Sequence, residues 1–114
     1  IHMGDHFFKN RFPYIDIGSG GDVDGFISNV EAVLAQVPED IKIIPGHGSL
    51  SNRADLASTI AVVKATAATI RAALDNDTDS AEIIADLNEN YPTWGSGFIN
   101  AERWVQIVKA DTSR

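Results

Sequence analysis

Two residues with metal-binding side chains each follow an apolar, strand-like segment of the sequence. Asp5 comes directly after Gly4, and His47 lies between Gly46 and Gly48. A carboxylate can bridge two cations, because each of its oxygens can bind one metal ion at about 2 Å. Glycines on both sides of a histidine keep its imidazole clear of neighbouring side chains, as a metal ligand or a general base requires. Asp5 and His47 are therefore the candidate metal ligands.

The remaining residues limit what such a site could be. With three histidines and no cysteine in 114 residues, the chain cannot complete a closed zinc site unless carboxylates or a second chain supply the other ligands. Side chains alternate along a strand, so His2 and His6 are expected on one face of the first strand and Asp5 on the other. The two other histidines are therefore not expected to share an ion with Asp5.

Three aspartates, Asp16, Asp22 and Asp24, lie next to the glycine-rich residues 18–21. Their spacing does not follow the twelve-residue, helix-flanked calcium loop. Asp22 precedes a helical pattern and is more simply explained as a helix cap. Calcium is therefore not expected at these residues.

Composition indicates one domain, residues 1–114. Hydrophobic residues make up 44% of the chain, enough for a core of its own. A net charge of -7 argues against a nucleic-acid partner, because binding to phosphates depends on clustered cations. The absence of cysteine excludes disulfides and thiolate sites, and the N-terminus lacks the regions of a signal peptide. No apolar run approaches the roughly 20 residues that span a bilayer. We therefore expect a soluble, cytoplasmic protein.

The hydrophobic pattern predicts seven elements. Residues 1–8, 12–17 and 41–44 read as strands, the second with Pro13 at an edge or a strand start. Apolar residues at three- and four-residue spacing predict a helix from Asp22 to Pro38 and a long helix after Ser51 or Asn52. Two further helices are predicted, one capped by Asp79 with Glu82 and ending near Tyr91, the other capped by Asn100. Trp94 and Phe98 are the expected aromatic anchors of the connector between them.

Four segments of the chain resemble the C-terminal half of the metallo-β-lactamase fold superfamily, and more narrowly its broad group of metallo-hydrolases. They are Met3-Gly4-Asp5-His6-Phe7-Phe8, Arg11-Phe12-Pro13-Tyr14-Ile15-Asp16, Gly20-Gly21-Asp22-Val23-Asp24-Gly25 and Ile43-Ile44-Pro45-Gly46-His47-Gly48. The resemblance continues through Leu50-Ser51, Ala54-Asp55-Leu56, Trp94-Gly95-Ser96-Gly97-Phe98-Ile99 and Glu102-Arg103-Trp104, and so covers almost the whole chain.

The resemblance implies an α/β (α+β) fold, half of an αβ/βα sandwich in which a small mixed sheet is covered by helices. In that family metals lie at the sheet edges between two such halves. Asp5 matches the aspartate that bridges two metals, and His47 matches the last histidine ligand. The His-x-His-x-Asp-His motif belongs to the other half and has no match here. The resemblance therefore implies a two-ligand partial site for zinc and no catalytic residue in this chain.

Three hypotheses follow. The chain is an incomplete metallo-hydrolase half, inactive alone because catalytic zinc normally needs at least three protein ligands and an open position for water. Its partner would be a complementary N-terminal half. Alternatively it is a non-catalytic, homo-oligomeric module, because a small sheet with residues 1–8 at its end leaves unpaired backbone groups and an apolar face. Thirdly, a dimer could pool two copies of Asp5 and His47 into one four-ligand site.

Overall fold

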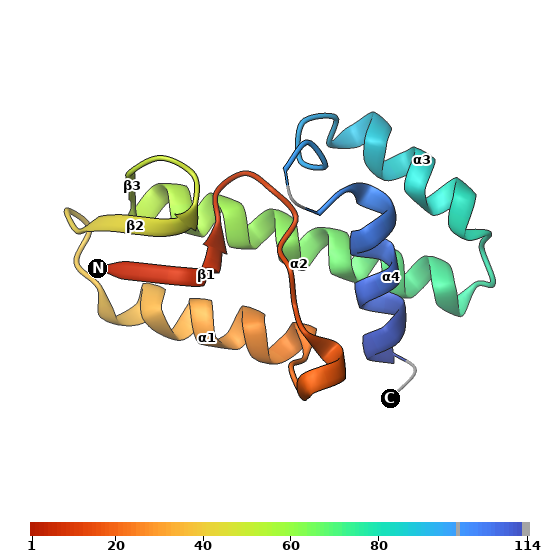
Figure 1. Ribbon diagram of the computed structural model, residues 1–114, viewed down its shortest axis with the longest axis horizontal. Helices are drawn as coiled ribbons and strands as arrows, with labels where there is room; N and C mark the ends of the chain where they lie inside the picture. Colours follow the sequence, from red (N-terminus) through yellow and green to blue (C-terminus); the bar gives the residue numbers. More distant parts are fainter. Residues whose placement is uncertain (98, 113–114) are drawn as a thin grey trace.

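A small sheet occupies one end of the molecule and a group of helices the other (Figure 1). The computed structural model describes residues 1–97 and 99–112. The strands are β1 (His2–Phe8), β2 (Lys42–His47) and β3 (Ser51–Asn52), and the helices are the 3-10 turn η1 (Ile17–Ser19), α1 (Val23–Gln36), α2 (Arg53–Asp75), α3 (Ser80–Asn90) and α4 (Ala101–Thr112). The predicted mixed α+β class is confirmed.

The sheet has the order β1-β2-β3 and is mixed, as expected. β1 pairs with β2 in parallel, and β2 pairs with β3 antiparallel. β1 is an edge strand with an irregular register, since it advances from Gly4 to Phe8 while β2 advances only from Pro45 to His47. The extra residues break the alternation of the strand. Asp5 and His6 are both exposed, and the next two residues, Phe7 and Phe8, are both buried.

The prediction of a strand at residues 12–17 is wrong. This segment is irregular until η1 begins at Ile17. Its side chains nevertheless belong to the core, because Phe12 is 1% exposed and Ile15 is 7% exposed. Pro13 has no N–H to give to a ladder, and the backbone N–H of Phe12 donates to the carbonyl of Trp94 at 3.1 Å instead. The hydrophobic pattern of residues 12–17 is therefore explained by burial in the core and not by pairing in the sheet.

The helix caps lie where the sequence predicts them. Asp22, Asn52 and Asp79 are the N-caps of α1, α2 and α3, and Asn52 forms a reciprocal capping box with Asp55. The Oδ1 atom of Asn100 accepts a hydrogen bond from the N–H of Arg103 at 2.8 Å, as a cap of α4 does. Each cap satisfies amide groups that the first helical turn leaves unpaired, which explains the sharp starts of these helices.

α2 runs along the molecule behind the sheet and connects its two ends (Figure 1). Five apolar residues recur on its buried side, Leu56, Ile60, Val63, Ala67 and Ile70. Across the described residues it is the one helix long and apolar enough to cross a membrane by length and composition, although the sequence pattern had indicated no such run. Core helices of soluble proteins also pass that test, and α2 buries one apolar stripe against the rest of the chain.

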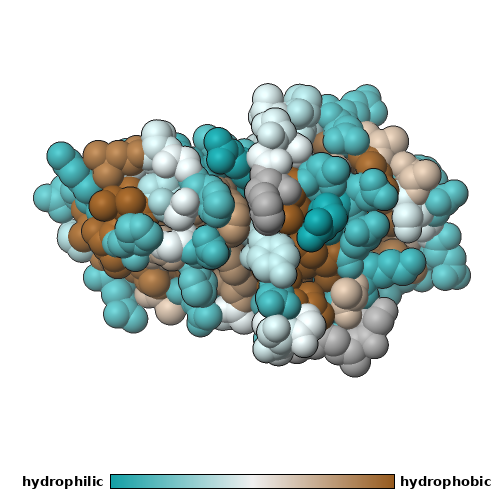
Figure 2. All heavy atoms as spheres, viewed as in Figure 1, coloured by the Kyte–Doolittle hydropathy of each residue, from teal (hydrophilic) through white to brown (hydrophobic). Residues whose placement is uncertain are grey.

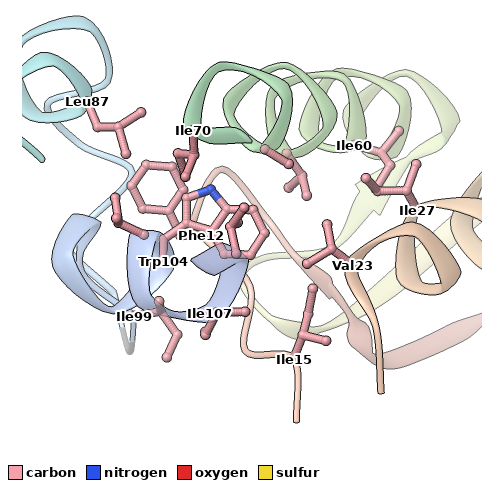
Figure 3. Close-up of a cluster of buried hydrophobic side chains, with 14 of the residues drawn as sticks. Phe12, Ile15, Val23, Ile27, Ile60, Ile70, Leu87, Ile99, Trp104 and Ile107 are labelled. Atoms are coloured by element: carbon pink, nitrogen blue, oxygen red, sulfur yellow. The ribbon is translucent and has the colours of Figure 1, made fainter. Parts of the chain in front are cut away.

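The core is centred on aromatic rings held between α2 and α4 (Figure 3). Trp104 is fully buried and stacks on Phe12, with ring centroids 6.1 Å apart. Trp94, the first expected anchor of the connector, packs against the same core, with its ring 6.2 Å from that of Phe12. The second expected anchor, Phe98, lies outside the described residues. This core packs the helices against one another. The candidate ligands Asp5 and His47 lie at the other end of the molecule, in the strands of the sheet.

Candidate metal site

Asp5 owes its position to the irregular backbone of β1. Gly4 has a φ of +55°, a conformation that glycine adopts without steric cost. The N–H of Gly4 donates to the Nδ1 atom of His2 at 3.0 Å, which satisfies a group that the regular ladder would have paired. Asp5 follows this turn, and its side chain is 77% exposed. The local break in β1 therefore presents the carboxylate at the surface instead of packing it against the helices.

His47 is the last residue of β2 and is brought close to β1 by Gly46. A Cβ atom added to Gly46 would lie 2.4 Å from the carbonyl oxygen of Gly4 and 3.0 Å from Oδ1 of Asp5. Real Cβ atoms do not approach a backbone oxygen so closely. Only a glycine at this position lets β2 pass β1 at this distance, so Gly46 sets the separation of the two candidate ligands.

Two neighbours orient the imidazole. The ring of Phe8 stacks on the ring of His47, with centroids 4.4 Å apart and 7° between the planes. The N–H of Lys9 donates to the carbonyl of His47 at 2.9 Å, and Nζ of Lys9 donates to the hydroxyl of Ser49 at 3.1 Å. These contacts hold the backbone and the ring of His47 from the side of β1. Neither Phe8 nor Lys9 was predicted to support the site, and only their place directly after the Asp5 segment indicates them.

The structure brings the two predicted ligands together. Nε2 of His47 lies 3.3 Å from Oδ1 of Asp5, and the two side chains are 39% and 77% exposed. A charge-assisted hydrogen bond is usually shorter, about 2.7–2.9 Å. Two donors bound to one tetrahedral zinc ion at about 2.0–2.1 Å lie about 3.3 Å apart. The separation of 3.3 Å is that of a surface ion pair, and two donors that share one ion would lie equally far apart.

Two donors do not make a complete site. Among the residues that the structure describes, no group of three or more His, Cys, Asp and Glu side chains could hold a metal ion. The donor types, imidazole and carboxylate, are ones that zinc accepts. Asp5 and His47 are therefore donors of suitable types, but two of them do not make up a zinc site on their own.

His6 follows Asp5 in β1 and makes a contact of its own. His2 and His6 line one surface hollow, as two residues on the same face should, but His6 and Asp5 line a second hollow of about 460 Å³. A common hollow does not fix the directions of the two side chains, so their expected placement on opposite faces stays a prediction. The extra residues in β1 interrupt the alternation on which that prediction rests. The ring of His6 stacks on Phe26 with centroids 5.6 Å apart. This contact explains its position without a metal.

The three other aspartates have structural partners. Oδ1 of Asp16 accepts from the N–H of Ser19, and Asp22 accepts from the N–H of Gly25. Asp24 forms an ion pair with Arg71 at 2.9 Å. These contacts account for the aspartates around the glycine-rich residues without a calcium ion.

Comparison of the chain with known protein families and with curated proteins found no match. The candidate site is therefore defined by the geometry of Asp5 and His47 alone.

Proposed function

We propose that this chain is half of a metal-dependent hydrolase and supplies two of the donors of its metal centre. The single observation that carries the proposal is the 3.3 Å separation of Asp5 Oδ1 and His47 Nε2. The resemblance to the C-terminal half of the metallo-β-lactamase fold assigns the same two residues as ligands. A bound divalent ion would supply the Lewis acidity that activates water for hydrolysis.

Neighbouring residues of this chain hold and orient the two donors, Asp5 and His47. Gly46 sets the distance between the strands, Phe8 fixes the plane of the His47 ring, and the turn at Gly4 projects Asp5 outward. The 460 Å³ hollow beside Asp5 offers space for a substrate group, with Tyr14 and Phe26 in its wall. The remaining ligands would come from a complementary half, and we assign the assembly to the cytoplasm. Two donors bind zinc weakly, so the purified chain should not hydrolyse esters, thioesters, amides or phosphoesters.

A non-catalytic, homo-oligomeric module is the second candidate function. Apolar residues gather at the sheet end of the molecule (Figure 2). Ile44 of β2 is 48% exposed and accompanies Ile1, which is 50% exposed and accepts a hydrogen bond from the N–H of Ile44. Leu50 is 60% exposed. Burying such side chains against a second copy would stabilise an assembly whether or not metal binds.

Calorimetric titration with zinc tests the first proposal. We expect weak binding by the wild-type protein and none by Asp5→Asn or His47→Ala. Both side chains are exposed, so neither substitution should unfold the chain, and circular dichroism checks this. His6→Ala is the matched control and should bind zinc like the wild type, because the ring of His6 stacks on Phe26. Equal zinc binding by all four proteins would refute the assignment of the donors.

A further inference from the structure

Most of the net negative charge of the chain lies in one short segment. Residues 75–90 contain six of the sixteen acidic residues and no Lys, Arg or His. The six are Asp75, Asp77, Asp79, Glu82, Asp86 and Glu89. The nine Lys and Arg and the other ten acidic residues lie elsewhere, so the rest of the chain is almost neutral. All six are exposed, and among the described residues none of them belongs to an ion pair. The helical end of the molecule therefore presents an acidic surface without cations (Figure 1).

A hollow of about 340 Å³ lies between α3 and the C-terminal part of α2, beside this surface. Its apolar lining includes Ile83 and Leu87, each 3% exposed, and the half-buried Tyr91. Glu82 and Asp86 line the same hollow and are exposed. They are four residues apart on α3, so their side chains lie on one side of the helix. The hollow therefore combines apolar walls with two carboxylates.

The stability of α3 does not account for all of its acidic residues. Asp79 is the N-cap, and Glu82 lies in the first turn, where the helix dipole favours a negative charge. Asp86 is placed four residues after Glu82, and like charges at this spacing destabilise a helix. Glu89 precedes the last helical residue, Asn90, where the dipole disfavours a negative charge. Asp86 and Glu89 therefore have no stabilising role within α3.

We propose that the hollow between α2 and α3 binds a basic segment of another protein. An apolar side chain of that segment lies in the hollow against Tyr91, and flanking Lys or Arg side chains lie against Glu82 and Asp86. Arg binds a carboxylate through two parallel N–H donors and also stacks on aromatic rings. The other carboxylates of residues 75–90 attract such a partner from a distance and speed its association.

The extent of the acidic surface favours a peptide segment over a small cation. α3 has 11 residues and is therefore about 16 Å long, with carboxylates at its N-cap, in its middle and next to its last residue. A single small cation contacts only part of this length, whereas a peptide can follow all of it. The surface lies at the end of the molecule opposite the sheet (Figure 1), so the inference does not depend on the proposed role of Asp5 and His47.

Fluorescence anisotropy with two labelled peptides tests the proposal. Both peptides carry the same number of Arg residues, which alternate with Leu in one peptide and with Ser in the other. We expect the Leu peptide to bind about tenfold more tightly, because only a leucine side chain gains from burial in the hollow. Raising the NaCl concentration from about 0.05 to 0.5 M should weaken its binding about fivefold, because salt screens exposed charges.

Two charge variants locate the site. Glu82→Gln combined with Asp86→Asn removes both carboxylates of the hollow and should weaken binding of the Leu peptide about tenfold. Glu39→Gln combined with Asp40→Asn is the matched control, because it removes the same charge from exposed residues between α1 and β2. The control should change the affinity less than about twofold. All four residues are exposed, so both variants should keep the fold, and circular dichroism checks this.

A variant that keeps every carboxylate tests the hollow itself. Thr69 is an exposed residue of α2 that lines the hollow, and Thr69→Phe would place an aromatic ring there. We expect this variant to lose the preference for the Leu peptide over the Ser peptide and to keep the salt dependence of binding. In amide NMR spectra of the wild type, the signals that the Leu peptide shifts should belong to residues 69–91 and not to the sheet.

Four results would overturn the proposal. The first is no binding of the Leu peptide at millimolar concentration, and the second is equal weakening of its binding by the two charge variants. The third is equal affinity for the Leu and Ser peptides, which would reduce the interaction to charge alone. The fourth is binding of spermine as tight as that of the Leu peptide, since a small polyamine has no apolar side chain to place in the hollow.

Discussion

The ring of His47 lies flat on the ring of Phe8, with centroids 4.4 Å apart and 7° between the planes. Phe8 is 3% exposed and fixed in the interior, whereas His47 is partly exposed. A rigid buried ring thus orients a surface imidazole, and Nε2 points to Asp5 as a result. Stacking of this kind contributes about 0.5–1.5 kcal/mol beyond the burial of area.

Replacing Phe8 by leucine should release His47 from this orientation. Protons of His47 that lie over the Phe8 ring are shielded by its ring current, so in Phe8→Leu their NMR signals should move downfield. Zinc affinity should fall as well, because the imidazole must then be ordered on binding. Phe26→Leu is the matched control and should shift the signals of His6, not those of His47. Unchanged His47 signals in Phe8→Leu would contradict the orienting role.

The contact of Gly46 with Gly4 predicts a second effect. In Gly46→Ala the new methyl group would meet the Gly4 carbonyl oxygen at 2.4 Å, and a backbone oxygen cannot rotate away as a side chain can. We expect β1 and β2 to separate, a loss of about 1–3 kcal/mol in the free energy of unfolding, and weaker zinc binding. Urea denaturation measures the first quantity and calorimetry the second.

Gly18→Ala is the control for this substitution. The nearest heavy atom to its Cβ would be Oδ1 of Asp16 at 3.7 Å, an ordinary contact. Stability should therefore stay within about 1 kcal/mol of the wild type. A loss in Gly18→Ala as large as that in Gly46→Ala would show that any methyl group, and not the contact with Gly4, is responsible.

Much of the fold could be predicted from the sequence, because its signals are local. Asp22, Asn52, Asp79 and Asn100 cap helices through hydrogen bonds within three residues of the chain. The apolar stripe of α2 likewise follows from the helical repeat. The meeting of Asp5 and His47 could be predicted less directly, because β2 ends at His47 whereas Asp5 lies within β1 and not at its end.

The remaining features depend on contacts between distant segments. Residues 12–17 have the composition of a strand, yet the burial of Phe12 against Trp94 and Trp104 determines their path. The extra residues of β1 depend on the register with β2, which no single strand specifies. The stack of Phe8 on His47 likewise joins two strands and was not predicted from the sequence.

A third prediction concerns the buried hydrogen bond between Trp104 and Thr66. Nε1 of Trp104 donates to Oγ1 of Thr66 at 3.0 Å, and the same hydroxyl donates to the carbonyl of Val62 at 2.8 Å. Thr66→Val keeps the shape and removes the acceptor, which leaves a buried indole N–H without a partner. We expect a loss of about 1–3 kcal/mol in the free energy of unfolding by urea denaturation.

Two variants bracket this result. Thr66→Ser keeps the hydroxyl and should lose less, because only a methyl group disappears. Thr69→Val changes an exposed threonine on the same helix and should stay within about 0.5 kcal/mol of the wild type. If Thr66→Val were as stable as Thr69→Val, the hydrogen bond would contribute nothing that water does not replace.

The last prediction concerns Arg71, which connects three helices. Its guanidinium donates to Asp24 of α1 at 2.9 Å and to Asp111 of α4 at 3.0 Å, and Asp111 also accepts from the N–H of Val23 at 3.4 Å. The hydrogen bond to Asp24 raises the pKa of Arg71, although burial acts in the opposite direction. Because the pKa of Arg71 is raised, the stabilisation that its charged guanidinium gives the fold is lost only when the pH rises through a very basic value. The contribution of Arg71 should therefore not change between neutral and mildly basic pH.

Arg71→Met should remove this connection and lower the free energy of unfolding by about 1–3 kcal/mol, most of it from the less exposed partner, Asp111. Lys64→Met is the control, since Lys64 pairs with Glu31 at 3.3 Å where both side chains are well exposed, and such pairs contribute about 0–1 kcal/mol. Urea denaturation at neutral and mildly basic pH measures both. Equal losses in the two variants would contradict a stabilising connection of the three helices through Arg71. A loss in Arg71→Met that disappears at the higher pH would contradict it too, because the guanidinium should stay charged there.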